Sequence, residues 1–454
     1  MTKSHAPTAY KPEVRAHYEA LPYPMRRVED EGKYFHGSEG YGAEALNHTA
    51  WAGRRDLRNA GRILIAGNGT GDASVQWAES LHGSDAEIVA IDLSATSNAL
   101  AQARLAKRQL TNVTFHHMSI LDLPEAGLGQ FDAIECTGVL HHLPDPDAGL
   151  RALASVLKDD GVMSLMVYAQ YGRHAIYMVQ EMMRRLMREG LDHAGQLALL
   201  RGFLDHVPTT HWLTVKNEAF LEDIRVPDGS GLYDLFLHST DRAYTVPQIY
   251  DWVAEAGLQL HRWFGDFTDD CIYRPQHYTQ HPEMLAAFQG KTEPELFAIG
   301  ELMHGSMAKH HFYVSKQPLK EAQLEDDMVI SYCLMQGIFH QHILGVLPEL
   351  ERASVGQRLS FANRPSPHAP AAILTKRAST AALIRAIDGH RTVAQLVQEV
   401  AGICGMDPLA VRADLAVLYQ EMRARLMVNL RHVSVPAYPT VAQMFQRIQA
   451  LGVR

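Results

Sequence analysis

Three glycines and one aspartate are the residues whose types and spacing point most directly to chemistry. Gly67, Gly69 and Gly71 follow the apolar run 63–66, and Asp92 ends a second apolar run. Glycine allows positive φ and lets a ligand approach the backbone closely. A carboxylate can accept hydrogen bonds from two hydroxyls. A strand, a glycine turn, a helix and a strand that ends in an acid indicate a unit that binds an adenosine-containing cofactor.

Regular alternation of strands and helices surrounds this unit. The pattern predicts strands at 63–66, 88–91, 113–115, 131–136, 162–168, 258–264 and 310–315, and helices at 46–59, 72–80, 95–107, 146–157 and 246–256. Alternation of this kind indicates an α/β fold with a Rossmann-like, doubly wound sheet of seven strands, which we expect to be parallel.

The remaining segments predict a division into three parts. We expect an N-terminal lid at 1–45 and a catalytic domain at 46–316, with helical insertions at about 171–242 and 266–305. The segment 316–325 is the best candidate for a linker. Residues 317–454 predict a smaller C-terminal helical or winged-helix-like domain, in which 426–433 could form the hairpin of the wing.

The spacing of the glycines also discriminates between cofactors. A GxGxG turn without GxGxxG, together with Asp92 at the end of the second strand, fits S-adenosylmethionine better than NAD. Four stretches extend this observation: IAGNGTG at 65–71, AIDLS at 90–94, SILDLP at 119–124 and FDAIECTGVLHHLPDP at 131–146. Through them, residues from about 60 to 168 resemble a class I S-adenosylmethionine-dependent methyltransferase.

The resemblance implies roles for individual residues toward the cofactor. Gly67, Gly69 and Gly71 would face the methionine part, with Asn68 in the same tight turn; Asp92 would hold the ribose; Leu93 would pack on the adenine; Ser119 and Ile120 would meet the adenine edge; and Cys136 and Thr137 would lie at the end of the fourth strand. Ser119 departs from the family pattern, in which an aspartate is common, and its hydroxyl makes a weaker hydrogen bond than an acid.

Four residues are candidates for catalysis, each with a structural alternative. His141 could be a general base, as could its neighbour His142, but helix capping or packing is the interpretation that we favour for a histidine there. Glu135 ends a buried strand and needs a partner, which could be the substrate amine or a structural group. Tyr23 and Tyr168 could wall the pocket or pack the insertion helices. Methyl transfer needs alignment more than a strong base.

Further polar residues are open to two interpretations. His238, Asp241 and Arg242 could line a substrate pocket or form a surface turn with an Asp–Arg pair. The 25 histidines include no HExxH or similar spacing. A metal site could therefore arise only where histidines distant in the sequence come together, and we predict none.

Composition limits the partners and the compartment. The net charge of −9 argues against binding of nucleic acid, and no apolar run is long enough to span a bilayer. The four cysteines are far apart and the first residues lack a signal-peptide pattern, so we expect a cytoplasmic protein. An apolar C-terminal face could also support a homodimer.

The acceptor stays open at this point. We favour a nitrogen of a peptide or protein side chain, because the accessory domain could recognise a polypeptide. A small metabolite, or a non-catalytic scaffold that binds the cofactor, are the alternatives.

Overall fold

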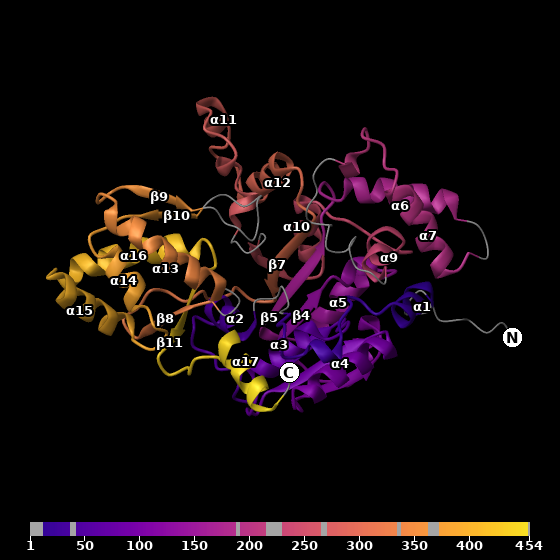
Figure 1. Cartoon of the computed structure of the whole chain (residues 1–454), viewed down its shortest axis with the longest axis horizontal. Helices are drawn as coiled ribbons and strands as arrows, with labels where there is room; N and C mark the ends of the chain where they lie inside the picture. Colours follow the sequence, from indigo (N-terminus) through magenta and orange to yellow (C-terminus); the bar gives the residue numbers. More distant parts are fainter. Residues whose placement is uncertain are drawn as a thin grey trace.

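The computed structural model describes residues 12–36, 42–187, 191–214, 229–264, 270–333, 337–361 and 372–452. Parts of the predicted lid and of both predicted insertions therefore lie outside the described residues. Figure 1 shows a central sheet with a helical cap at one side and a C-terminal unit at the other.

Seven strands form the central sheet. They are β1 (Arg62–Ala66), β2 (Glu87–Asp92), β3 (Val113–His117), β4 (Phe131–Thr137), β5 (Leu157–Tyr168), β6 (Gln259–Phe264) and β7 (Lys309–Ser315), in the order β3-β2-β1-β4-β5-β7-β6. The doubly wound, seven-stranded sheet is confirmed, but the expectation that it is wholly parallel is wrong. β7 lies between β5 and β6 and is antiparallel to both, because the chain after β6 turns back instead of crossing over the sheet.

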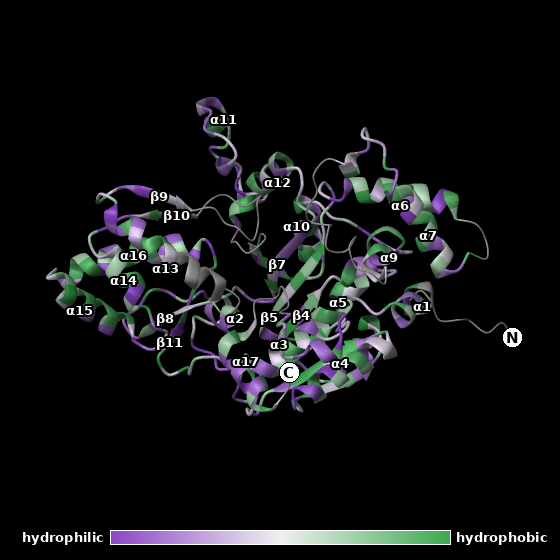
Figure 2. Ribbon diagram, viewed as in Figure 1, coloured by the Kyte–Doolittle hydropathy of each residue, from purple (hydrophilic) through white to green (hydrophobic). Residues whose placement is uncertain are grey.

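Apolar side chains of β1 alternate between two cores, as the pleat of a strand requires. Leu64 and Ala66 join a core that includes α5 (Pro146–Val156) and α10 (Val246–Glu255). Ile63 and Ile65 join a second core on the other face, with helices α2 (Gly42–Ala50), α3 (Asp72–Ser80) and α4 (Ala95–Lys107). The strands accordingly include many of the most hydrophobic segments in Figure 2. The helix predicted at 46–59 is α2, which begins and ends earlier.

Helices inserted after β5 form a cap. They are α6 (His174–Leu186), α7 (His193–Leu204) and α9 (Ser230–Phe236), with the short helix η4 (Trp212–Thr214). The first three share an apolar core, against which Leu21 packs from the end of helix α1 (Pro12–Ala20). These helices lie within the insertion that the sequence places at about 171–242. The cap places α9 beside α1 near the sheet (Figure 1).

The second insertion, between β6 and β7, is also mainly helical. It contains η6 (Asp270–Tyr273), η7 (Pro275–His277), α11 (Pro282–Ala287) and α12 (Glu293–His304). Phe297 of α12 and Tyr273 of η6 are buried in the same core as α5 and α10, so this insertion also covers the sheet.

The C-terminal unit has its own apolar core. Its elements are β8 (Met328–Tyr332), α13 (Gly337–Arg352), β9 (Arg358–Phe361), β10 (Ala372–Thr375), α14 (Thr380–Ala386), α15 (Val393–Cys404), α16 (Pro408–Arg423), β11 (Val428–His432) and α17 (Val441–Ala450). The prediction of a local hairpin at 426–433 is wrong. This segment contributes one strand, β11, whose antiparallel partner is β8, while β9 and β10 pair with each other.

The segment predicted as a linker, 316–325, lies against α2. The backbone of Ala322 donates to the carbonyl of His48 (2.8 Å), and the imidazole of His48 accepts from the backbone N–H of Leu430 (2.9 Å). The carboxylate of Glu321 pairs with Arg262 of β6 (2.6 Å) and Arg423 of α16 (3.3 Å). The C-terminal unit is therefore joined to the sheet by polar contacts from several elements. None of the described helices is long and apolar enough to cross a membrane.

Candidate active site

The predicted site residues gather where parallel strands end. Ala66 of β1 is level with Ile91 of β2, and Thr137 of β4 is level with Met166 of β5. The glycine turn, the end of β2, the loop after β4 and the end of β5 consequently share the carboxyl edge of the sheet, where open α/β sheets bind ligands.

The glycine turn after β1 leaves no room for a side chain at Gly67 or at Gly71. Gly67 has φ of 82°, and a Cβ there would lie 2.2 Å from Val139. Gly71 has φ of 98° at the start of α3, and a Cβ would lie 2.7 Å from Ala101. Any other residue would be strained and would collide. Between them, Asn68 is buried and its side-chain oxygen accepts a hydrogen bond from Ser74.

Asp92 connects the end of β2 with the glycine turn. Its carboxylate accepts the N–H of Gly69 (2.7 Å) and the N–H of Ser94 (2.8 Å). Burial raises the pKa of Asp92, and these two hydrogen bonds oppose the rise. A carboxylate has about four lone-pair directions, so two stay available for the hydroxyls of a diol. Leu93 is half-buried, and its carbonyl oxygen contacts Nε2 of His117 (2.8 Å).

The four remaining residues predicted to contact the cofactor differ in the role of their side chains. Ser119 caps η2 (Ile120–Glu125), and its hydroxyl accepts from the N–H of Leu121 (3.2 Å). Ile120 and Cys136 belong to the apolar core, where burial raises the pKa of the Cys136 thiol. Thr137 has a buried hydroxyl for which no partner is found among the described residues. Of these side chains, Thr137 has the most evident capacity for a further hydrogen bond.

The N-terminal segment crosses the glycine turn. Thr70 donates its hydroxyl to the carbonyl of Pro24 (2.7 Å), and a Cβ on Gly69 would lie 2.9 Å from the carbonyl oxygen of Tyr23. Tyr23 therefore lies at the turn through its backbone. This contact gives Gly69 a reason to be glycine that the sequence motif alone does not reveal.

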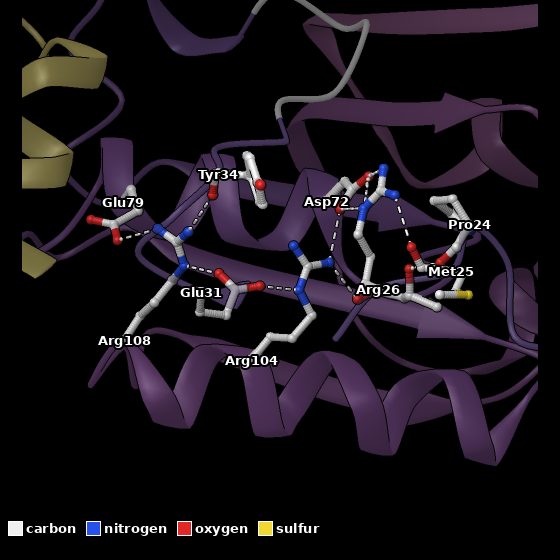
Figure 3. Close-up of polar contacts among 10 residues, drawn as sticks. Pro24, Met25, Arg26, Glu31, Tyr34, Asp72, Glu79, Arg104 and Arg108 are labelled. Atoms are coloured by element: carbon white, nitrogen blue, oxygen red, sulfur yellow. Dashed lines mark hydrogen bonds and ion pairs between the residues drawn. The ribbon is translucent and has the colours of Figure 1, made fainter. Parts of the chain in front are cut away.

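A buried ion network holds this segment in place (Figure 3). Glu31 pairs with Arg104 of α4 and with Arg108, the residue that follows α4, and all three side chains are at most 4% exposed. Arg104 also pairs with Asp72 at the start of α3 (2.8 Å), and Asp72 pairs with Arg26 (2.6 Å). Alternating charges thus fasten residues 26–31 beside the turn.

The network continues to the last helix of the described chain. Arg108 pairs with Glu79 of α3 (3.1 Å), and Glu79 pairs with Arg447 of α17 (2.6 Å). The C-terminal helix and the N-terminal segment therefore share charged partners on α3 and α4.

Histidines and tyrosines fill the space on the cap side of the edge. His141 and His142 form the short helix η3 (Leu140–His142) after β4, and the ring of His141 stacks on Tyr168 at 3.8 Å. His142 stacks on His238 at 3.8 Å. Asp145 then caps α5 by accepting the N–H of Ala148 (2.9 Å), which ends the loop.

A carboxylate from the cap lies among these rings. Asp234 of α9 accepts hydrogen bonds from Tyr18 of α1 (2.8 Å) and from Tyr168 at the end of β5 (3.3 Å). Burial lowers the pKa of His142 to about 4 and that of His238 to about 3, so both rings are neutral at neutral pH. Burial holds the pKa of His141 well below its usual value.

Glu135 lies on the opposite side of β4 from Cys136. Its carboxylate accepts the indole N–H of Trp77 on α3 (2.6 Å), and both side chains are buried. This contact supports the structural alternative for Glu135, since α3 covers the face away from the cap. The sheet and α3 together explain why a carboxylate can be buried there.

The three pocket candidates of the first insertion, His238, Asp241 and Arg242, lie in different surroundings. His238 faces His142, as described above. Asp241 is buried and accepts from Gln180 (3.0 Å) and Arg173 (3.5 Å), and the guanidinium of Arg173 lies 3.4 Å from the ring centre of Tyr168. Arg242 is more exposed and pairs with Asp147 (3.2 Å). Asp241 therefore belongs to the wall behind Tyr168.

Sequence reasoning missed His17 and Asp234, which the fold brings to the site from α1 and α9. Neither lies in a motif, and their meeting depends on contacts between segments about two hundred residues apart. The local signals were the adjacent His17–Tyr18 pair and the polar, aromatic stretch 234–244.

The site and fold define a protein that binds an adenosine-containing cofactor at the switch region of an open α/β sheet. Residues 64–163 match the family described as "Methyltransferase domain". An uncharacterized protein of Synechococcus sp. is 31% identical over 322 residues, covering 69% of this chain and 74% of that protein. The ubiquinone biosynthesis O-methyltransferase of Xanthomonas oryzae pv. oryzae is 31% identical over 173 residues, covering 38% of this chain and 67% of that enzyme.

Among solved structures, PKMT2 from Rickettsia typhi has the same fold. Its TM-score is 0.61 at 17% identity, and the match covers 92% of this chain and 81% of that chain. A second structure of it, in complex with AdoHcy, gives a TM-score of 0.59.

The chain belongs to the class I S-adenosylmethionine-dependent methyltransferases, and it is an enzyme that uses this cofactor. The residues present fit the cofactor. The glycine turn leaves no room for side chains, the carboxylate of Asp92 has lone pairs to spare, and the buried hydroxyl of Thr137 offers a further hydrogen bond.

Proposed function

We propose that the enzyme methylates a side-chain nitrogen of a peptide or protein. The observation that carries this proposal is the carboxylate of Asp234, which lies on the cap side of the cofactor edge beside Tyr18, Tyr168 and His238. A buried carboxylate surrounded by aromatic rings suits an amine, because both the charge and the ring faces attract ammonium groups.

The C-terminal unit supports a polypeptide acceptor. The match to PKMT2 of Rickettsia typhi spans 92% of this chain and so includes much of this unit. A shared C-terminal unit next to the catalytic sheet offers additional surface for a large acceptor.

The roles of the chain's own groups follow from their positions. S-adenosylmethionine supplies a methyl group that its sulfonium activates for displacement. Asp92 and the glycine turn orient the donor, and Asp234 orients the amine. His142 donates Nδ1–H to the carbonyl of Thr240 (2.8 Å), so its Nε2 carries the lone pair that can accept a hydrogen bond from the amine. Alignment of the two reactants contributes most of the acceleration.

A small-molecule acceptor is the second candidate. The match to an O-methyltransferase of ubiquinone biosynthesis favours it, and Nε2 of His142 can accept a hydrogen bond from a hydroxyl as well as from an amine.

Labelling distinguishes these acceptors. The full-length protein is incubated with methyl-labelled S-adenosylmethionine and with separated protein, RNA and small-molecule fractions of a lysate. Alkali-stable label in the protein fraction, reduced at least tenfold in Asp234→Asn and retained in Asp147→Asn, is the expected result. Asp147 is a matched control because it is an aspartate on the surface beside the same loop. Label confined to small molecules or to RNA would refute the proposal.

A further inference from the structure

A second property of the cap side is a set of nitrogen atoms without hydrogen-bond partners. Nε2 of His17, of His142 and of His238 is buried, and none of the three has a partner among the residues that the structure describes. Each of these side chains is at most 5% exposed. An unpaired buried polar atom is costly, so three of them around one carboxylate indicate that a ligand belongs there.

We propose that His142, Asp234 and His238 form a binding site for a divalent transition-metal ion of the zinc type. One ligand atom from each residue lies within 4.8 Å of the other two. The residues come from the loop after β4 and from the cap, so the site closes the joint between the sheet and the cap. Two imidazoles and one carboxylate are a donor set that zinc and its neighbours prefer.

Hydrogen bonds from neighbouring groups orient His142 and Asp234 as metal ligands require. Nδ1–H of His142 is held by the carbonyl of Thr240 (2.8 Å), which leaves the Nε2 lone pair directed to the site. The phenols of Tyr18 and Tyr168 donate to the carboxylate of Asp234 and fix its orientation. Such outer contacts orient ligands and strengthen metal binding.

His238 must adjust to complete the site. Its Nδ1 accepts the N–H of Thr240 (3.1 Å), so the neutral ring carries its proton on Nε2. Coordination through Nε2 moves this proton to Nδ1 and ends that hydrogen bond. Two ligands of one zinc ion lie no more than about 4 Å apart, so the side chains also move inward by up to about 1 Å.

His17 is the candidate for a fourth ligand. Its ring centre lies 5.4 Å from that of His238, and burial lowers its pKa to about 3, so the ring is neutral and free of charge repulsion toward a cation. Coordination by His17 would tie α1 to the cap and the sheet at once.

The proposed metal site and the proposed site for the methyl acceptor use the same side chains. Asp234 and His142 serve the amine in the proposed reaction, so an ion bound to them competes with the acceptor. The metal site nevertheless stands apart from the identity of the acceptor, because binding of an ion is measured without any acceptor.

Zinc alone is the probe for the test. The metal-free, full-length protein is titrated with Zn²⁺ against a chromophoric chelator, and Co²⁺ is used in parallel for its visible spectrum. We expect one ion per chain, a Co²⁺ spectrum typical of nitrogen and oxygen ligands, and affinity at least 100-fold lower in His142→Ala and in Asp234→Asn. His82→Ala, which removes an exposed histidine outside the cluster, should bind as the wild type does.

Two results would overturn the site. One is wild-type protein that binds no Zn²⁺ with a Kd below about 10 μM while it still binds S-adenosylhomocysteine. The other is affinity unchanged in both cluster variants, provided that each variant keeps the wild-type circular dichroism. His238→Gln, which preserves volume, guards against a folding defect: it too should lose Zn²⁺ affinity. Failure here leaves the labelling result untouched, and failure of the labelling experiment leaves the zinc titration untouched.

Discussion

Replacement of Asp92 by asparagine tests how the donor site is built. The carboxylate accepts two backbone N–H groups, from Gly69 at 2.7 Å and from Ser94 at 2.8 Å. The amide of asparagine has one acceptor oxygen, so its NH₂ group must face one of these donors. The variant therefore distorts the turn and also loses a charged partner for the ribose hydroxyls.

The size of the effect follows from the strength of one charged hydrogen bond. Such a bond contributes about 1.5–3 kcal/mol, which corresponds to a loss of affinity of about 10- to 150-fold at 1.4 kcal/mol per factor of ten. Isothermal titration with S-adenosylhomocysteine measures it directly. Glu87→Gln is the matched control, since Glu87 lies at the other end of the same strand with an exposed side chain that pairs with Arg62.

We expect Glu87→Gln to bind within twofold of the wild type. A folded Asp92→Asn variant with unchanged affinity would refute the ribose assignment. Equal losses of affinity in the two variants would show that any change of charge on β2 has this effect. They would refute the inference that the position of Asp92 at the glycine turn determines cofactor binding.

Three further predictions concern buried polar groups. Trp77→Phe removes the indole donor to Glu135 and should lower the free energy of unfolding by about 1–3 kcal/mol. Glu135→Gln keeps an acceptor for the indole, so the rate of labelling should stay within threefold of the wild-type rate; a 100-fold slower rate would make Glu135 catalytic. Arg104→Met leaves Glu31 short of a buried partner and should cost about 3–5 kcal/mol in thermal unfolding. Arg385→Met, which removes an exposed pair with Glu351, should cost less than about 1 kcal/mol; equal costs would contradict the network. Burial lowers the pKa of His48 to about 4 despite the nearby Glu321. As the pH falls below about 6.5, the ring therefore gains a proton in the unfolded chain before it does so in the folded chain. The wild type should lose about 2 kcal/mol of stability between pH 7 and pH 5 that His48→Asn does not lose; melting curves that shift equally in both proteins between these pH values would exclude this.

Local sequence patterns were enough to predict most of the central fold. The helices at 72–80 and 95–107 begin where the sequence predicts, because Gly71 precedes the first and Ser94 caps the second by accepting the N–H of Ser97 (3.0 Å). Most of the seven strands were recognisable as apolar runs, although β3 and β6 are about half polar. The direction of β7 was not, because an apolar run reads the same in either direction and only the path of the preceding insertion decides it.

Long-range contacts account for what sequence reasoning missed. β11 has no partner nearby in the chain, so its pairing with β8 carries no local pattern. Asp234 and His17 become neighbours of the site only when the cap packs on α1. The absence of a metal motif was correctly noted in the sequence, but histidines and carboxylates that meet through folding need no fixed spacing. Ser119 departs from the family pattern, and its hydroxyl is used by the cap of η2.

The pair between Glu79 and Arg447 also sets an order of events during synthesis. These residues are 368 positions apart, and a ribosome that adds about 5–20 residues per second needs roughly 20–70 s to travel between them. The strands of the sheet are all made before Arg447 appears. A nascent chain can therefore form the glycine turn and the Glu31 pairs early, while the last charged contact of the network waits for the final helix to leave the ribosome. Ribosome-bound chains halted before residue 447 should hold their N-terminal segment less firmly than released enzyme, as measured by its rate of proteolysis.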